Sequence, residues 1–240
     1  MNNPKLSLIG PAIRPLGWQK FVEGLYNNDV DYEVIFLGPN PPVCALPNNY
    51  HYIETNVKPA QCYEAGVRIS KGELIMLIVD DTQFIEDHPL DKLVTFYESF
   101  NDSRIVVSCM CMFMNVPSVH CQNIYGNREL LPSWVGLRSK EYYYKLGGLD
   151  SRFLASYVVM DLDLRVWKDG GRVVLSSVYC NEDYTQSTLW TESCPLDDPI
   201  MQYLWLDEHK NIKQQRTLPI IPFTDYRILE ESQEPKGRWI

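Results

Sequence analysis

Two adjacent carboxylates, Asp80 and Asp81, directly follow the most apolar run of the sequence, residues 74–79. Carboxylate oxygens are the ligands that Mg²⁺ and Mn²⁺ prefer in proteins, and these ions commonly bridge a protein to a substrate phosphate. Aspartate at the end of a strand also caps local turns, and for the pair taken alone this structural role is the more frequent one. The pair indicates a metal site only if a second motif supports it.

A second group of carboxylates lies in the other half of the chain. A Gly-Gly-Leu-Asp turn at 147–150 is followed by the segment 160–165, which carries Asp161, Asp163 and Arg165. Residues two apart lie on different faces of a helix, whereas residues four apart are neighbours, so Arg165 is placed to pair with Asp161 and Asp163 points elsewhere. A helix dipole also favours a carboxylate near its start, which is the structural explanation for Asp161.

The first half of the chain alternates short apolar runs with amphipathic stretches, a pattern that predicts an open α/β sheet. Open sheets of this kind bind ligands beyond the carboxyl ends of their strands. Three polar or irregular segments fall there, at 11–14, 38–40 and 80–81. The pattern predicts strands at 6–10, 32–37, 50–55 and 73–79, and helices at 18–25 and 60–69.

The second half is less regular, and its elements are expected from apolar spacing and glycine stops. The region after about residue 180 is polar, contains prolines and is rich in aromatic residues. We expect it to form a tail that wraps the domain. The pattern predicts helices at 90–100, 141–146, 156–169 and 198–209, and strands at 105–114 and 172–178.

Composition excludes several classes of protein. The chain has 240 residues and a net charge of −9, so it lacks the basic surface of a protein that coats nucleic acid. We expect no nucleic-acid partner, no transmembrane segment and no secretory signal. The seven cysteines contain no Cys-x-x-Cys pair, which favours free thiols in the reducing cytoplasm, in a soluble or peripherally associated protein. The absence of Gly-x-Gly-x-x-Gly argues against a dinucleotide-dependent oxidoreductase.

Together, the segments 60–81, 147–153 and 160–165 resemble the family 2 glycosyltransferases. That family has the GT-A fold, a Rossmann-like nucleotide-diphospho-sugar transferase fold with a mixed, mostly parallel central sheet flanked by helices. The resemblance covers about residues 5–180. It implies a single GT-A domain over 1–240, with a nucleotide-binding half at about 1–100, an acceptor-binding half at 101–180 and a wrapping tail at 181–240.

The resemblance implies an inverting transfer of a sugar from a nucleotide-diphosphate donor to an acceptor hydroxyl. Asp161 corresponds to the family's general base, and a divalent cation, Mn²⁺ or Mg²⁺, would offset the charge on the leaving diphosphate. The cation ligands would be Asp81 and, from the tail, His209. Donor-nucleotide contacts are expected from Pro11, Ala12, Arg14, Gly38, Asn40, Lys58, Gln61, Tyr63 and Asp80, and acceptor contacts from Trp134, Gly148 and Asp150.

The sequence also departs from the family pattern. Ile78 stands where an additional aspartate is frequent, and Met160 stands where glutamate is common. These departures keep open a non-catalytic nucleotide-sugar or glycan-binding module on the same fold. A sugar nucleotidyltransferase is a further alternative, although residues 10–14 lack the glycine-rich phosphate loop expected for one. The donor sugar, its base, the acceptor and the oligomeric state are not defined by the sequence.

Overall fold

The computed structural model describes residues 3–113, 116–117, 124–125, 127, 129–182 and 189–226. Its strands are β1 (Leu6–Pro11), β2 (Tyr32–Gly38), β3 (Tyr50–Glu54), β4 (Leu74–Leu77), β5 (Gln83–Phe84), β6 (Ile105–Phe113), β7 (Val116–Pro117), β8 (Gly136–Ser139) and β9 (Arg172–Glu182). Its helices are the short 3-10 turn η1 (Pro15–Gly17), α1 (Trp18–Gly24), α2 (Pro59–Ile69), α3 (Pro89–Glu98), α4 (Lys140–Lys145), α5 (Val158–Lys168) and α6 (Leu189–Trp205).

The strands form one mixed sheet in the order β3-β2-β1-β4-β8-β6-β9-β5, with β7 paired to β6. The strands β3, β2, β1 and β4 run parallel, and so do β6 and β9. β8 is antiparallel to both β4 and β6, so it joins the two parallel groups. The parallel order places the carboxyl ends of β1, β2 and β4 at one edge of the sheet, as the sequence pattern predicts.

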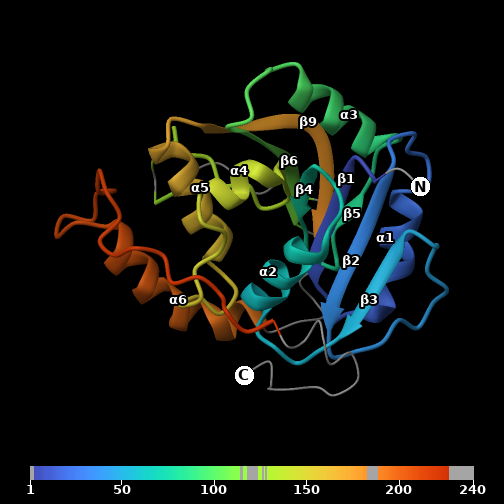
Figure 1. The fold of residues 1–240 in the computed structure, drawn as a ribbon, viewed down its shortest axis with the longest axis horizontal. Coiled ribbons are helices and arrows are strands. Elements are labelled where there is room, and N and C mark those ends of the chain that lie inside the picture. The colour runs from blue at the N-terminus through green and yellow to red at the C-terminus, as the bar shows by residue number, and fades with distance from the viewer. Residues whose placement is uncertain are drawn as a thin grey trace.

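Helices cover both faces of the sheet (Figure 1). Because side chains alternate along a strand, Leu8 packs in one core with α1 and α3, and Ile9 packs in the other with α2, α5 and α6. The strands β1, β2 and β4 are therefore buried on both faces, which explains why they read as nearly continuous apolar runs. Helix α5 ends before Gly170, whose φ of +78° suits glycine in the turn that stops the helix.

The structure corrects the expected tail helix. A helix over 198–209 is wrong, because α6 begins at Leu189 and ends at Trp205. Pro195 and Pro199 lie inside α6, where proline normally interrupts a helix. Burial of Met201, Leu204 and Trp205 in the core shared with α2 and α5 holds the helix in place.

The structure adds β8 to the expected strands and lengthens β9. β8 carries the fully buried Arg138, which pairs with Asp163 of α5 at 3.1 Å and also donates to Ser133. Asp163 thus lies on another face of α5 from Asp161, as its spacing predicts. β9 extends four residues past its expected end, to Glu182. The added residues Cys180 and Asn181 pair with β5.

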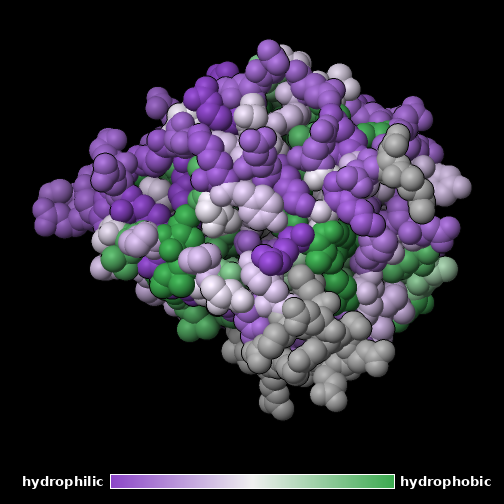
Figure 2. Space-filling model, viewed as in Figure 1, coloured by the Kyte–Doolittle hydropathy of each residue, from purple (hydrophilic) through white to green (hydrophobic). Residues whose placement is uncertain are grey.

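Figure 2 shows a face that is mainly hydrophilic, with separate hydrophobic patches. Among the described residues, none of the helices is both long enough and apolar enough to cross a membrane.

Candidate functional site

Asp80 is fully buried and organises the loop that follows β1. Its Oδ2 accepts from the backbone N–H groups of Ile13 at 2.7 Å and Arg14 at 2.5 Å, and from Trp18 Nε1 at 3.2 Å. Its Oδ1 accepts from Arg14 Nε and Nη2 at 2.8 and 2.6 Å. Since both oxygens are occupied, Asp80 fixes the loop after β1 and offers no free oxygen in this arrangement.

Asp81, unlike Asp80, has one carboxylate oxygen that accepts no hydrogen bond within the described residues. Its Oδ2 accepts from Arg14 Nη1 at 2.7 Å, whereas its buried Oδ1 has no hydrogen-bond partner within the described residues. Burial raises the pKa of Asp81 to about 8, with Arg14 acting in the opposite direction and Glu182 adding to the increase. Burial alone would lower the pKa of Arg14, but Asp80 and Asp81 more than offset this and hold it above its ordinary value.

The Asp81 oxygen fits one protein ligand of a hard divalent cation, the arrangement in which substrate phosphates complete the coordination. His209, the other candidate ligand, is exposed and pairs with its neighbour Glu208 at 3.5 Å. A separate group that could hold a metal, Asp29, His88 and Asp91, lies at the start of α3.

The ends of β1 and β2 approach each other closely beside this loop. Ala12 N donates to Leu37 O at 2.9 Å, and a Cβ on Gly38 would meet Ala12 O at 1.7 Å. Only glycine fits at Gly38. The side chain of Asn40 donates to Ile13 O at 2.8 Å. Six of the predicted donor residues and the predicted metal ligand Asp81 therefore form one group, which we call the donor cluster: Pro11, Ala12, Arg14, Gly38, Asn40, Asp80 and Asp81.

Helix α2 connects the donor cluster to the turn before α5. The buried Tyr63 donates to Ile78 O at 2.8 Å, two residues before Asp80. Lys58, just before the helix, donates to Ser151 O at 2.5 Å, and burial lowers the pKa of its ammonium. Gln61 donates to the backbone of Asp225 at 3.0 Å and so faces the C-terminal tail.

Glu64, which the sequence interpretation assigned no role, holds the Gly-Gly turn against α2. It accepts from the Tyr143 hydroxyl and from Leu149 N at 3.0 Å. Gly148 has a φ of +70°, and a Cβ there would lie 2.9 Å from the Glu64 carboxylate. The signal that the sequence offered was the position of Glu64 next to Tyr63 on a predicted helix.

Asp161 is fully buried at the start of α5, and both of its oxygens are engaged. Its Oδ1 accepts from Trp205 Nε1 at 2.7 Å and from Arg216 Nε at 2.8 Å. On the other side, Arg165 Nε and Nη2 lie 3.1 and 3.0 Å from Oδ2, which confirms the pair expected from their spacing. In this arrangement Asp161 has no free surface.

Arg216 joins the two motif carboxylates. Besides Asp161, it binds Asp150 through Nη2, and Arg152 binds the same Asp150 oxygen at 2.6 Å. Burial raises the pKa of Asp150, but the hydrogen bonds from Arg152 and Arg216 more than offset this effect and hold the pKa below its ordinary value. Asp150, Asp161, Arg165, Trp205 and Arg216 form what we call the acceptor-side cluster.

Helix α6 supports the loop that enters α5. The buried Asp197 accepts from Leu154 N, Ala155 N and Ser156 N at 2.7–2.8 Å. Three adjacent N–H groups on one carboxylate fix the loop in front of Asp161. Trp134 is half-buried and packs against both hydrophobic cores, which favours a packing role for it as much as a ligand contact.

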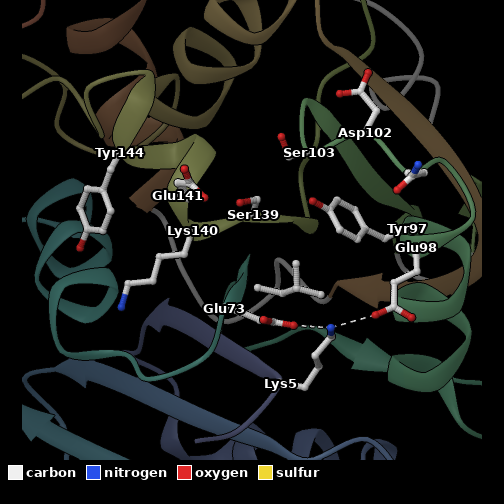
Figure 3. Close-up of a pocket in the computed structure, with 12 residues that line it drawn as sticks. Lys5, Glu73, Tyr97, Glu98, Asp102, Ser103, Ser139, Lys140, Glu141 and Tyr144 are labelled. Carbon is white, nitrogen blue, oxygen red and sulfur yellow. Dashed lines mark hydrogen bonds and ion pairs between the residues drawn. The ribbon is translucent and has the colours of Figure 1, made fainter.

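A hollow of about 710 Å³ opens at the opposite edge of the sheet, where β1 and β4 begin (Figure 3). Lys5 bridges Glu73 and Glu98 across it, and Tyr97 and Tyr144 lie on its rim. None of the predicted site residues lines it. The candidate site is instead the pair of clusters connected by α2.

No family model matches the sequence, and no curated protein matches it. Solved structures of GT-A glycosyltransferases match the fold. S. aureus TarS 1–349 in complex with UDP-GlcNAc has a TM-score of 0.58 at 11% identity, covering 76% of this chain and 59% of that one. The mannosyltransferase PcManGT from Pyrobaculum calidifontis, in complex with GDP-Man and Mn²⁺, has a TM-score of 0.55 at 14% sequence identity. The match covers 78% of this chain and 59% of that one.

GalNAc-T7 with UDP, GalNAc and Mn²⁺ has a TM-score of 0.58 at 12% identity, and the match covers 87% of this chain and 49% of that one. The chain thus spans less than two thirds of each of these structures. The fold is GT-A, as the sequence motifs indicate.

Proposed function

We propose that this protein transfers a sugar from a nucleotide-diphosphate donor to an acceptor hydroxyl, with inversion at the anomeric carbon. The observation that carries the proposal is the buried Oδ1 of Asp81 at the carboxyl edge of a GT-A sheet, which has no hydrogen-bond partner in the part of the chain that the structure describes. The neighbours that are solved with UDP-GlcNAc, or with GDP-Man and Mn²⁺, support this class of donor.

In this proposal Asp81 and the β1 loop bind the diphosphate end of the donor. Mn²⁺ or Mg²⁺ bound at Asp81 would supply positive charge for the leaving nucleoside diphosphate. Arg14 is held beside Asp81 and brings a fixed positive charge to the same place. Asp161 takes the proton of the acceptor hydroxyl as that oxygen attacks the anomeric carbon.

Thermal denaturation with nucleotide sugars tests the proposal. Ligands that bind only the native state raise its melting temperature. We expect UDP-GlcNAc or GDP-mannose to raise the melting temperature more with Mn²⁺ than without it. UMP and GMP serve as controls, because they lack the diphosphate. No shift with any nucleotide sugar from a broad panel, with or without Mn²⁺, would contradict the proposal.

Metal-assisted binding should depend on pH. A carboxylate must lose its proton to bind a cation, and burial raises the pKa of Asp81 to about 8. We therefore expect the apparent affinity for Mn²⁺, with saturating UDP, to increase about fivefold between pH 7 and 8 and to level off about one pH unit higher. Titration of Mn²⁺ by electron paramagnetic resonance measures this. The Asp81→Asn variant should give a flat profile, and an equally steep one would disprove the assignment.

The engaged state of Asp161 favours one alternative, a nucleotide-sugar-binding module without transferase activity. Such a module would bind the donor with Mn²⁺ and yet neither transfer nor hydrolyse it. Turnover of a bound nucleotide sugar separates the two functions. We place either function in a reducing compartment, because the described cysteines are thiols and form no disulfide with one another.

A further inference from the structure

The contacts of Asp161 leave no place for an acceptor. Asp161 is fully buried, and it accepts hydrogen bonds from Trp205 and Arg216 at Oδ1 and from Arg165 Nε at Oδ2. The second nitrogen of Arg165, Nη2, lies 3.0 Å from Oδ2 without completing a hydrogen bond. A general base has to come within hydrogen-bond distance of the proton that it takes. One of these contacts must therefore be released before Asp161 can act.

Arg216 is the contact that can be released. Trp205 is 1% exposed and belongs to the core at the end of α6, and Arg165 is fixed on α5 by a further bond to Leu146 O at 2.7 Å. Arg216 instead belongs to residues 206–226, which we call the C-terminal strap. Apart from Phe223 and Leu206, the strap has no buried residue.

The strap lies on the surface and is held mainly by polar contacts. It leaves α6, forms a protruding loop and returns toward α2 (Figure 1), and that loop is hydrophilic (Figure 2). Lys213 N and Thr217 N donate to Trp205 O and Leu204 O at 2.8 and 3.0 Å. Segments with few buried apolar contacts and exposed hydrogen bonds open at low free-energy cost.

We infer that Arg216 is a positioning residue that gates Asp161. The strap holds its guanidinium on Oδ1 until an acceptor hydroxyl takes that position, and Asp150 retains the displaced guanidinium. The inference rests on the proposed function, since it assumes that Asp161 is the base.

The gate has a chemical purpose. In transfer, the bond from the anomeric carbon to the phosphate oxygen breaks, and its electron pair leaves with the nucleoside diphosphate. The acceptor oxygen forms the new bond, and its proton passes to Asp161. Water could enter by the same route and attack the anomeric carbon, which would hydrolyse the donor. With Arg216 on Oδ1, water finds no proton acceptor.

Donor hydrolysis tests the gate. Arg216→Met removes the donors but keeps the side-chain length, and we expect it to speed hydrolysis of UDP-GlcNAc or GDP-mannose with Mn²⁺ about tenfold, the equivalent of one charge-assisted hydrogen bond. Lys210→Met is the matched control: it removes an exposed strap cation that bonds Gln202 and neither aspartate. Arg216→Lys keeps the charge and should restore slow hydrolysis. Unchanged or slower hydrolysis in a folded Arg216→Met protein overturns the inference.

Hydrogen exchange supplies a readout that needs no activity. In Arg216→Met, the amides of Lys213 and Thr217 should exchange about tenfold faster, while the α5 amides stay protected. Equal strap protection in the wild type and the variant overturns the gate. If the wild type binds no nucleotide sugar, the proposed function fails, and the exchange result still decides whether Arg216 holds the strap closed.

Discussion

Replacing Asp161 with asparagine is expected to lower sugar transfer by about two to four powers of ten and to leave donor binding unchanged. Asparagine has the same size as aspartate but takes no proton at neutral pH. The donor cluster lies at the ends of β1, β2 and β4, and none of the hydrogen bonds described for it involves Asp161. We therefore expect the substitution to leave the donor cluster unchanged. Transfer rates and nucleoside-diphosphate binding should be measured on the same preparation.

Two controls make the Asp161 result interpretable. Asp169→Asn changes an aspartate at the other end of α5, where it bonds Lys145, and should retain the wild-type rate. Because Asp161→Asn removes a charge beside Arg165 and Arg216, a melting curve of this variant must accompany its rate. A folded Asp161→Asn protein with a wild-type rate would exclude Asp161 as the base.

The second large effect is expected at Asp81. We expect Mn²⁺ to tighten binding of UDP or GDP about a hundredfold, or ~2.7 kcal/mol, and Asp81→Asn to abolish this gain. The metal-free affinity should change little, because Arg14 remains bonded to Asp80. Calorimetric titration with and without Mn²⁺ measures both quantities.

The site at the start of α3 provides the discriminating control for this experiment. His88 lies 3.1 Å from Asp91 there, in the group that could also bind a cation. His88→Ala should leave the Mn²⁺ effect intact. If the effect instead survives Asp81→Asn and disappears in His88→Ala, the cation binds at α3 and the assignment to Asp81 is wrong. Asp87 is exposed and lies between Asp81 and His88 in the sequence, and Asp87→Asn should leave the Mn²⁺ effect unchanged.

The parallel half of the fold could be predicted because local signals agree there. Apolar runs end at glycine or proline after β1 and β2, and Pro59 begins α2 with the φ that a first helical turn requires. β8 could not be found in this way, since Arg138 interrupts its apolar pattern and is tolerated only through Asp163, which lies far away in sequence. Helix α6 was misplaced because its two prolines argue locally against a helix that tertiary packing maintains.

The candidate site divides in the same way. Asp80, Asp81 and Asp161 could be proposed from the sequence because they follow a strand end and a helix start within motifs that resemble those of a known family. Arg216 and Glu182 were missed, because nothing near them in the sequence indicates which buried carboxylates they approach. The engagement of every Asp161 oxygen also depends on contacts between α5, α6 and the strap, which no local pattern encodes.

Helix α2 gives the two clusters a shared mechanical element. Tyr63 binds the segment before Asp80, and Glu64, the next residue, binds the turn that carries Asp150. A small rotation of α2 would therefore change both clusters at once. Any ligand that favours one position of the helix biases the other cluster by the same free energy, and this linkage is reciprocal. Under the proposed function, we therefore expect donor and acceptor affinities to depend on each other through one helix of eleven residues.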